Sequence, residues 1–379
     1  MTLPLSRLRM IDLSRQLPGP FCSMLLADFG VDVLAIANPT DPMGVGIPFL
    51  ARNKRHMTLN LKSAAGRDVL LRLAEDSDIL LEGYRPGVPA RLGIDYDTLR
   101  ARHPRLIYCS ISGYGQDGPY RDRVGHDVNY LGYAGVLNFV CEAGGPPVIP
   151  GVQIADIAGG ALMAAVGILT AVIAREQTGQ GQFVDVAMLD GSTACNAYHV
   201  LMYLLTGHLP QRGREQLTGR YACYAVYETR DGRHVTVGAF EPHFWATLCR
   251  HFGRADFIET QWDEDPRRTE MLAFFRDAFR RKTLAEWMQE LGDADICFGP
   301  VNTLDETFAD PQLRHRGMIV DMETPTGQTR VLGPPIKLSG TPASLRTPPP
   351  GFGEHTEAVL HSLGFSTDAI TELRTQGVI

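Results

Sequence analysis

The chain has 379 residues, of which 44% are hydrophobic and 21% charged, and its formal net charge is −7. These values are ordinary for a soluble globular enzyme and predict two domains, or one large core with a smaller inserted domain. The negative net charge argues against nucleic acid as the main partner, because duplex binders need a basic face.

Strand-like and helix-like segments alternate through the first half of the chain. In chain order, the sequence predicts a strand at 9–13, a helix at 18–30, strands at 31–36 and 57–61, a helix at 63–77, strands at 78–82 and 106–112, a helix at 157–176 and a strand at 183–188. This alternation is typical of a parallel sheet with helices on its faces. We therefore predict an α/β fold with a Rossmann-like large domain over residues 1–200.

The predicted helix at 157–176 is unusually apolar. Its first 18 residues carry no charge, which is just long enough to consider a membrane span. The stretch is rich in Gly and Ala and is bracketed by Asp156 and Arg175. We interpret it as a helix buried on all sides in a large core, and we expect no membrane association.

The pattern changes after about residue 220. Two β-rich runs at 223–240, joined through Asp231-Gly232, predict a hairpin. Helices are predicted near 242–253, 268–281 and 283–292, and a second hairpin at 318–333. We predict a small α+β domain over 221–325, after which residues 326–379, with a final helix at 367–375, return to the large domain.

The seven cysteines are scattered and form no CxxC pair. This distribution favours reduced thiols over a disulfide framework and offers no zinc-ligand spacing. The segment MTLPLSRLRMIDL lacks the long apolar run of a secretory signal. We expect a cytoplasmic protein with no metal site.

Four residues are candidates for acid–base chemistry. Asp156 stands at the start of the apolar helix, where a carboxylate is either a cap or a general base or nucleophile. His126 follows a glycine in RVGHDVNYLG, and a histidine side chain suits proton transfer, although His126 is one of eleven histidines. Taken alone, Glu241 is better explained as a helix-start carboxylate, and a simple cap is likewise an alternative for Asp127.

Basic residues of the first domain offer phosphate contacts or, alternatively, a solvated charged face. They are Arg52, Lys54, Arg55 and Lys62, followed by Arg85 and Arg91 beside Tyr84. The GVG at 44–46 lacks the strand and helix that a dinucleotide fingerprint requires. The sequence contains no GxSxG, Walker loop or HExxH.

Several motifs in a fixed order resemble the family III CoA-transferase superfamily of the CaiB/BaiF type. They are LPGPFCSMLLADFGVDV, NLKSAAGRD, EGYRPG, SGYGQDGP, TGQGQFVDVAMLDG and EHTEAVLHSLG, which together span almost the whole chain. Gly125, His126, Asp127, Asn129 and Tyr130 match the GHD-x-N-Y motif of its 2-methylacyl-CoA racemase branch. The active-site Asp of that branch matches Asp156, and its GA-x-EP glutamate matches Glu241. No GGGG run typical of the transferase branch is present.

The resemblance implies racemisation of 2-methylacyl-CoA by proton transfer at the carbon next to the thioester. Asp156 and His126 would be the acid–base pair, Glu241 would orient His126, and a backbone N–H near Asp127 would stabilise the enolate. The family positions for CoA carry over to Arg52, Leu61, Lys62, Tyr84, Arg85, Arg91, Gly125 and Tyr130. The family's common basic residue after the second strand is replaced by Asn38, which puts one CoA contact in doubt.

The resemblance also implies an interlocked homodimer, with each site between the large domain of one subunit and the small domain of the other. It requires no cofactor, because CoA is part of the substrate. Two other functions stay open. One is a CoA-transferase that uses Asp156 as a nucleophile, and the other is a CoA-binding protein without catalysis.

Overall fold

The structure is a computed structural model that describes residues 2–41, 48–324 and 327–379. The weak GVG signal at 44–46 lies outside the described residues. The chain divides into two compact units, each described by itself. Unit 1 comprises residues 1–136, 151–197 and 311–379, and unit 2 comprises residues 137–150 and 198–310.

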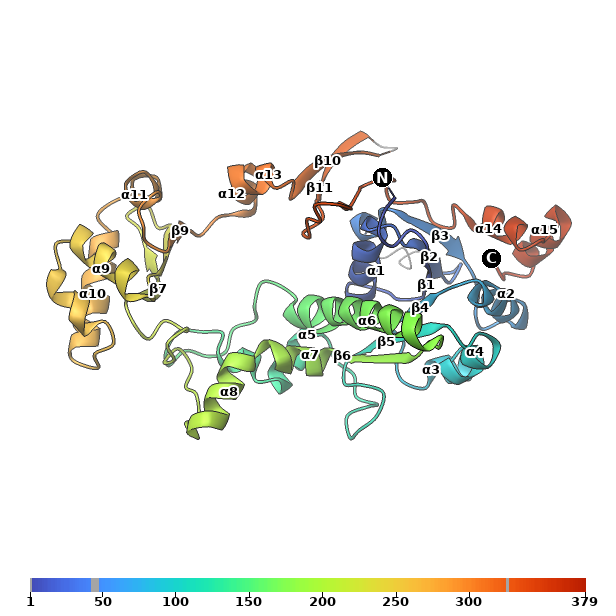
Figure 1. Cartoon of the computed structure of the whole chain (residues 1–379), viewed down its shortest axis with the longest axis horizontal. Helices are drawn as coiled ribbons and strands as arrows, with labels where there is room; N and C mark the ends of the chain where they lie inside the picture. Colours follow the sequence, from blue (N-terminus) through green and yellow to red (C-terminus); the bar gives the residue numbers. More distant parts are fainter. Residues whose placement is uncertain (1, 42–47, 325–326) are drawn as a thin grey trace. The chain divides into compact units, whose positions relative to one another are not determined.

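Unit 1 is built on a six-stranded, wholly parallel sheet (Figure 1). Its strands in chain order are β1 (Arg9–Asp12), β2 (Asp32–Ala37), β3 (Lys54–Thr58), β4 (Ile79–Glu82), β5 (Ile107–Ser112) and β6 (Phe183–Ala187). Their spatial order is β3-β2-β1-β4-β5-β6, so the winding direction reverses between β1 and β4. The predicted α/β, Rossmann-like fold is confirmed.

Helices cover both faces of this sheet. One face packs α2 (Ala64–Glu75), α4 (Tyr96–Arg102), α14 (Thr356–Ser362) and α15 (Thr367–Thr375) against the strands in one apolar core. The other face carries α1 (Pro18–Asp28) and the continuous helix formed by the π-helical segment η4 (Ala155–Leu162) and α6 (Met163–Thr178). The remaining helical segments of this unit are η2 (Pro48–Ala51), α3 (Val88–Leu92), α5 (Asp127–Tyr133), α7 (Met188–Cys195) and α13 (Pro311–His315).

The expectation that the apolar helix is buried on all sides is wrong. Its buried residues lie along one face, which packs on β5, β6 and α1, whereas Leu162, Val166 and Ile173 on the other face are 39%, 61% and 62% exposed. By length and composition alone, Ala155–Thr178 would be able to cross a membrane, with 33% of its most apolar window buried. The Gly and Ala residues serve close packing on one side: a Cβ on Gly191 of α7 would lie 2.2 Å from the carbonyl oxygen of Gly159.

The strand predicted at 57–61 is β3, which begins three residues earlier, at Lys54. Lys54 and His56 are charged or polar, so the pattern of apolar residues starts only at Met57. Both side chains are nevertheless buried. Lys54 Nζ is accommodated by the carbonyl oxygen of Pro20 at 3.0 Å, the hydroxyl of Ser23 at 2.7 Å and the Asp12 carboxylate at 3.5 Å.

Unit 2 combines a three-stranded antiparallel sheet, in the order β7-β8-β9, with three main helices. The strands are β7 (Tyr224–Glu228), β8 (His234–Gly238) and β9 (Phe298–Pro300), and the helices are α9 (Pro242–His251), α10 (Arg267–Phe279) and α11 (Leu284–Leu291). The predicted hairpin through Asp231-Gly232 is confirmed, with Gly232 at φ 71°. Shorter segments are η3 (Val136–Asn138), α8 (Ala197–Thr206), η5 (Ala255–Thr260) and α12 (Leu304–Ala309).

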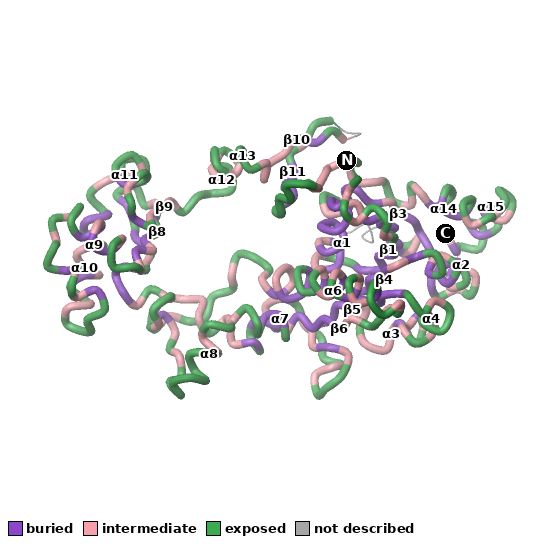
Figure 2. Tube along the Cα trace, in the orientation of Figure 1, coloured by how far each residue is buried: buried purple, intermediate pink, exposed green. Residues whose placement is uncertain are grey.

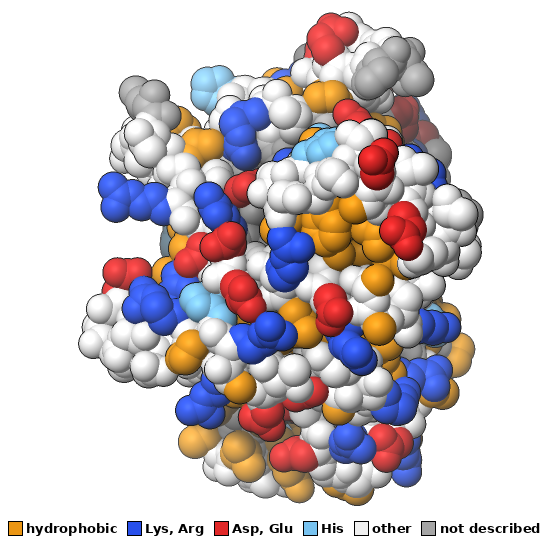
Figure 3. Space-filling view, turned by 90° about the vertical axis from the view of Figure 1, so that its right-hand side faces the viewer, with side chains coloured by type: hydrophobic (Ala, Val, Ile, Leu, Met, Phe, Trp, Pro, Cys, Tyr) orange, Lys and Arg blue, Asp and Glu red, His pale blue; other side chains and the backbone are white. Residues whose placement is uncertain are grey.

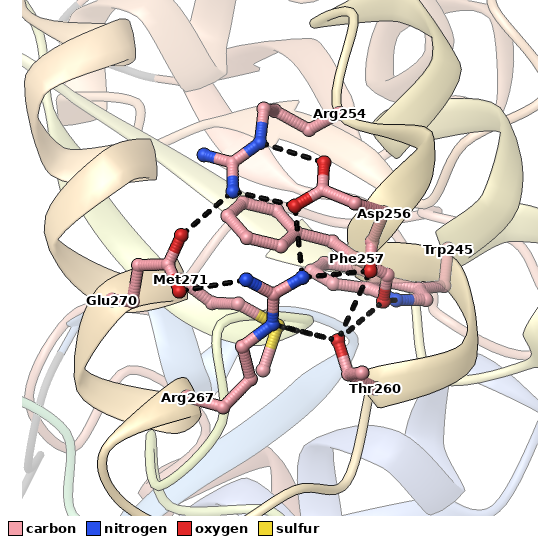
Figure 4. Close-up of polar contacts among 8 residues, drawn as sticks. All are labelled: Trp245, Arg254, Asp256, Phe257, Thr260, Arg267, Glu270 and Met271. Atoms are coloured by element: carbon pink, nitrogen blue, oxygen red, sulfur yellow. Dashed lines mark hydrogen bonds and ion pairs between the residues drawn. The ribbon is translucent and has the colours of Figure 1, made fainter.

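Aromatic side chains fill the core of unit 2, where Trp245 and Phe275 are completely buried. A charged cluster seals the edge of this core: Arg254 lies 3.4 Å above the ring centre of Phe257 and pairs with Asp256 and Glu270 (Figure 4). Figure 2 shows α8 mostly in green, and none of its residues is buried.

The boundaries of unit 2 differ from the predicted domain at 221–325. Residues 137–150 and 198–220 belong to it, whereas the hairpin of β10 (Ile319–Thr324) and β11 (Gly327–Leu332) belongs to unit 1 together with the C-terminal residues. The hairpin itself was predicted at 318–333 and is confirmed by its antiparallel pairing. Unit 2 therefore consists of two separate stretches of chain, 137–150 and 198–310, which a single continuous domain could not represent.

Candidate active site

A cavity of about 750 Å³ lies in unit 1, at the carboxyl ends of the parallel strands. Its walls come from residues 14–16, 18 and 19 after β1, 83–86 after β4 and 111–114 at the end of β5, together with 123–126, 129, 130 and Asp156. The loops after β1 and β4 flank the point where the strand order reverses, which is where open α/β sheets bind ligands. The volume is in the range of small-molecule and cofactor sites.

His126 and Asp156 both line this cavity. His126 is the N-cap residue of α5, and its backbone N–H donates to Asn129 Oδ1 at 3.0 Å. Tyr130 Oη donates to the carbonyl oxygen of Gly125 at 2.6 Å. Residues of the GHD-x-N-Y motif thereby brace one another and direct an exposed imidazole to the cavity that also holds the half-buried carboxyl of Asp156.

Asp127 does not line the cavity but anchors Asp156. One oxygen of its carboxylate, Oδ2, accepts the backbone N–H groups of Ala155 at 2.7 Å and Asp156 at 3.1 Å. These are the first N–H groups of η4, which have no acceptor inside the helix. Asp127 therefore caps the helix that carries Asp156. The capping role that the sequence also allowed for Asp156 is thus filled by Asp127.

The environment of Asp156 makes its carboxyl a stronger proton acceptor. Burial, and after it the negative charge of Asp127, raise the pKa of Asp156 to about 6, whereas His126 opposes this rise. A carboxyl with such a pKa exchanges protons near neutral pH and is suited to general acid–base catalysis.

Four arginines line the cavity: Arg15, Arg85, Arg121 and Arg123. Arg15 pairs with Asp41 at 2.9 Å, and Arg121 donates to the carbonyl oxygen of Gln116 at 2.9 Å. Such a concentration of guanidinium groups suits phosphates. Only Arg85 was predicted. The other three lie in loops without regular periodicity, where the sole sequence signal is their position directly after a strand or before the GHD motif.

The predicted CoA-binding residues fall into two groups. Tyr84, Arg85, Gly125 and Tyr130 line the cavity, whereas Arg52, Leu61, Lys62 and Arg91 are not among its lining residues. The guanidinium of Arg91 nevertheless lies near that of Arg121, since a Cβ on Gly87 would be 3.7 Å from one and 3.5 Å from the other. Leu61 is buried in the sheet core, and Lys62 is exposed.

Arg52 serves the fold in this structure. Its side chain is 2% exposed, forms two bonds to the carboxylate of Asp28 at 3.1 and 2.6 Å, and donates to the carbonyl oxygen of Leu332 at 2.6 Å. A guanidinium whose donors are used in a buried pair does not reach a ligand, so this geometry disagrees with the prediction that Arg52 binds CoA. The sequence could not distinguish the two uses of an arginine.

Two further residues stand apart from the cavity. Glu241 belongs to unit 2, where it is the exposed N-cap residue of α9, three residues after the end of β8. Asn38 closes a turn by accepting the backbone N–H and the hydroxyl of Thr40 at 2.9 and 2.8 Å. Among the described residues, no group of three or more His, Cys, Asp or Glu side chains is placed to hold a metal ion.

Comparisons with known proteins agree along the whole chain. The family model for CoA-transferase family III matches residues 5–356. The alpha-methylacyl-CoA racemase of Homo sapiens is 37% identical over 380 residues, which cover 100% of this chain and 98% of that protein. The succinyl-CoA:glutarate CoA-transferase of Homo sapiens is 31% identical over 99% of this chain and 90% of its own. A solved structure of a CAIB/BAIF family protein from Brucella suis has a TM-score of 0.82 at 29% identity, covering 96% of this chain and 100% of that one.

Proposed function

The chain belongs to CoA-transferase family III, an enzyme family that handles CoA thioesters, and from this premise we propose that it is a racemase of 2-methylacyl-CoA. The observation that carries the proposal is the placement of His126 and Asp156 in one cavity, with the pKa of Asp156 raised to about 6. Inversion at an acidic carbon requires one group that removes a proton and a second that supplies one, and a carboxyl and an imidazole are both able to do this.

In the proposed reaction, C2 of the acyl group loses one proton and then gains another on the opposite face. One of the pair removes the proton from C2, and the electrons of the C–H bond pass to the thioester oxygen to give an enolate. The other then donates a proton to the opposite face of C2, which restores the thioester with inverted configuration. The enolate oxygen is proposed to accept the backbone N–H of Asp127. The arginines of the cavity are proposed to hold the phosphates of CoA, remote from the reacting carbon.

Proton exchange tests this function directly. The purified protein is incubated with a (2R)-2-methylacyl-CoA in deuterium oxide, and deuterium at C2 is followed together with optical purity. We expect exchange accompanied by racemisation, absent from a heat-inactivated control. Transfer of CoA to an added acid such as succinate, without exchange at C2, would contradict the proposal.

A CoA-transferase is the second candidate, and the 31% identity to a succinyl-CoA:glutarate CoA-transferase favours it. In that case the Asp156 carboxylate would attack the thioester carbonyl and release the CoA thiolate, leaving an acyl–aspartyl anhydride. The thiolate would then attack the aspartyl carbonyl, releasing the acid and forming an aspartyl-CoA thioester. The two reactions differ in whether Asp156 becomes covalently modified.

The pH profile should report Asp156. A reaction that needs its ionised form is expected to rise about tenfold per pH unit below pH 6 and to level off above it, since the pKa of Asp156 is raised to about 6. The measurement is kcat/KM for exchange between pH 4.5 and 8. In Asp127→Asn the neighbouring negative charge is gone, so the ascending limb should move to lower pH. A limb at the same pH in both proteins would contradict this account.

We also propose that the chain acts as a homodimer, in which Glu241 of a second copy orients the imidazole of His126. The exposed apolar face of η4 and α6, which carries Leu162, Val166 and Ile173, supports this proposal, because soluble proteins rarely leave such a stripe uncovered. We propose that a second copy of the chain, and not a membrane, covers this face.

Sedimentation equilibrium is expected to give twice the chain mass of 41.7 kDa. Val166→Glu should shift the protein toward monomer, because a buried unpaired charge opposes association. Ala101→Glu is the matched control: this exposed residue lies on α4, and Figure 3 shows charges of both signs interspersed on the end of unit 1 that it depicts. A monomeric wild-type protein, or equal masses for all three proteins, would contradict the proposal.

A further inference from the structure

Two adjacent strands of the sheet end in the same way. β1 ends at Asp12 and β4 at Glu82, and each of these acids is 2% exposed. The backbone N–H two residues later bonds to each carboxylate: Ser14 N–H donates to Asp12 Oδ1 at 2.9 Å, and Tyr84 N–H donates to Glu82 Oε2 at 2.6 Å. The same local fold therefore redirects the chain after both strands.

The two loops that begin there are neighbours, and both line the cavity. Residues 14–19 and 83–86 contribute nine of its lining positions, whereas Asp12 and Glu82 do not line it. A Cβ on Gly83 would lie 3.8 Å from Cβ of Ser14. The first loop also carries Gln16 at φ 62°, a backbone conformation that non-glycine residues hold only where their surroundings impose it.

Asp12 fixes the first loop at both of its ends. Its carboxylate accepts the Ser14 N–H and hydroxyl at the start of the loop and the hydroxyl of Ser23, on α1, beyond its end. Lys54, itself buried, compensates the charge at 3.5 Å and donates to Ser23 and to the Pro20 carbonyl. Taking two charges out of water can cost more free energy than their mutual attraction returns, so a buried ion pair is weak evidence for stability and must be judged by what it holds in place.

Glu82 fixes the second loop from the other side. It pairs across the sheet with Ser110, whose hydroxyl also accepts the side-chain amide of Gln116 at 2.8 Å, and Gln116 N–H donates to Asp185 at 3.1 Å. Burial raises the pKa of Glu82 to about 7, and the bonds from Ser110 and from Tyr84 N–H oppose the rise. The carboxylate therefore connects Tyr84 and Arg85 to a polar network that runs along three strand ends.

We propose that Asp12 and Glu82 are positioning residues for CoA thioesters: held under the cavity, they set the two loops whose side chains, Arg15, Tyr84 and Arg85 among them, meet the CoA moiety. This inference rests on the proposed CoA-thioester function and deepens it. It predicts that two residues which do not contact CoA themselves determine how tightly CoA binds.

The test compares variants by calorimetric binding of CoA itself at pH 8, where Glu82 is ionised. Glu82→Met keeps the side-chain length and removes the acceptor of Tyr84 N–H, and it is expected to raise the Kd for CoA about tenfold. Glu82→Gln retains an oxygen acceptor and should remain within about threefold of wild type. Asp12→Asn replaces the carboxylate that faces Lys54 with a neutral amide, and it should also raise the Kd for CoA about tenfold. Where an acyl-CoA is turned over, KM should follow the Kd and kcat should change less than about threefold.

Asp28→Asn is the matched control, because Asp28 is an equally buried acid paired with Arg52 and Asn53, and none of the three lines the cavity. It should lower the melting temperature and leave the Kd unchanged. An unchanged Kd in a folded Glu82→Met protein would overturn the proposal, as would an equal loss of affinity in Asp28→Asn. If Glu82→Met does not fold, Asp12→Asn decides by the same criterion. Because the binding of CoA is measured without turnover, failure of the racemase assay would leave this test intact.

Discussion

Replacing Asp156 with Asn is expected to lower the rate of racemisation by a factor of about 10²–10⁴, the usual contribution of a positioned proton-transfer group. The enantiomer whose C2 proton faces His126 should still exchange that proton with solvent. The amide has nearly the same shape as the carboxyl but neither takes nor gives a proton at neutral pH. The backbone bonds from Ala155 and Asp156 to Asp127 do not involve the side chain, so η4 should keep its position. Exchange is measured with each enantiomer of a 2-methylacyl-CoA in deuterium oxide.

Asp122→Asn is the control for this experiment. It makes the same chemical change on an 81% exposed carboxylate that pairs with cavity-lining Arg121 but does not itself line the cavity. We expect its rate to stay within about twofold of wild type, because exposed ion pairs contribute little. A folded Asp156→Asn protein that keeps more than a tenth of the wild-type rate of racemisation, followed as loss of optical purity, would show that the proton-transfer role lies elsewhere. An acyl adduct on Asp156 that hydroxylamine traps would instead establish the transferase.

His126→Ala should separate the two functions by stereochemistry. If Asp156 and His126 serve opposite faces of C2, racemisation falls by about 10²–10⁴. One enantiomer, the one whose proton faces Asp156, should still exchange that proton with solvent and retain its configuration. The measurement is the ratio of deuterium incorporation to loss of optical purity for each hand.

A transferase gives a different result in the same variant, since the nucleophile Asp156 is intact and CoA transfer should fall much less. His361→Ala, an exposed histidine on α14 outside the cavity lining, serves as the control and should change neither rate. Complete racemisation by His126→Ala at the wild-type rate would exclude His126 from the acid–base pair.

The parallel sheet was predictable because its strands are buried on both sides and read as short apolar runs. The exception, β3, shows the limit: Lys54 and His56 are inside the protein, and only their partners at distant positions explain why. The helix at 155–178 was placed correctly, but its degree of burial was overestimated, since apolar composition does not say which neighbour covers each face.

The candidate site was predicted mainly from motifs shared with a known family, and less from the chemistry of the individual residues. His126 and Asp156 stood out only together with the resemblance, because one histidine among eleven and one carboxylate at a helix start have simpler explanations. The cavity-lining arginines were mostly missed, and Arg52 was assigned to CoA although Asp28 holds it. Which arginine meets a ligand depends on loop paths, and those depend on long-range contacts such as the ones that Asp12 and Glu82 make.

The π-helical turn at the start of the long helix has a consequence for how this site tolerates insertions and deletions. The segment Ala155–Leu162 is π-helical, with hydrogen bonds between residues five apart, whereas the α-helix that follows has the buried positions Ala164, Ile168 and Ala171 at intervals of three or four residues. The segment thus holds one residue more per turn than an α-helix, and each residue of an α-helix advances about 100° around the axis. Loss of a single residue here would let the helix keep its packing on the sheet yet rotate Asp156 by about that angle, away from the cavity. The extra residue sets the angle around the helix axis between the face that packs on the sheet and the carboxyl of Asp156. The residues of the packing face can therefore change without turning Asp156 away from the cavity, as long as this turn keeps its length.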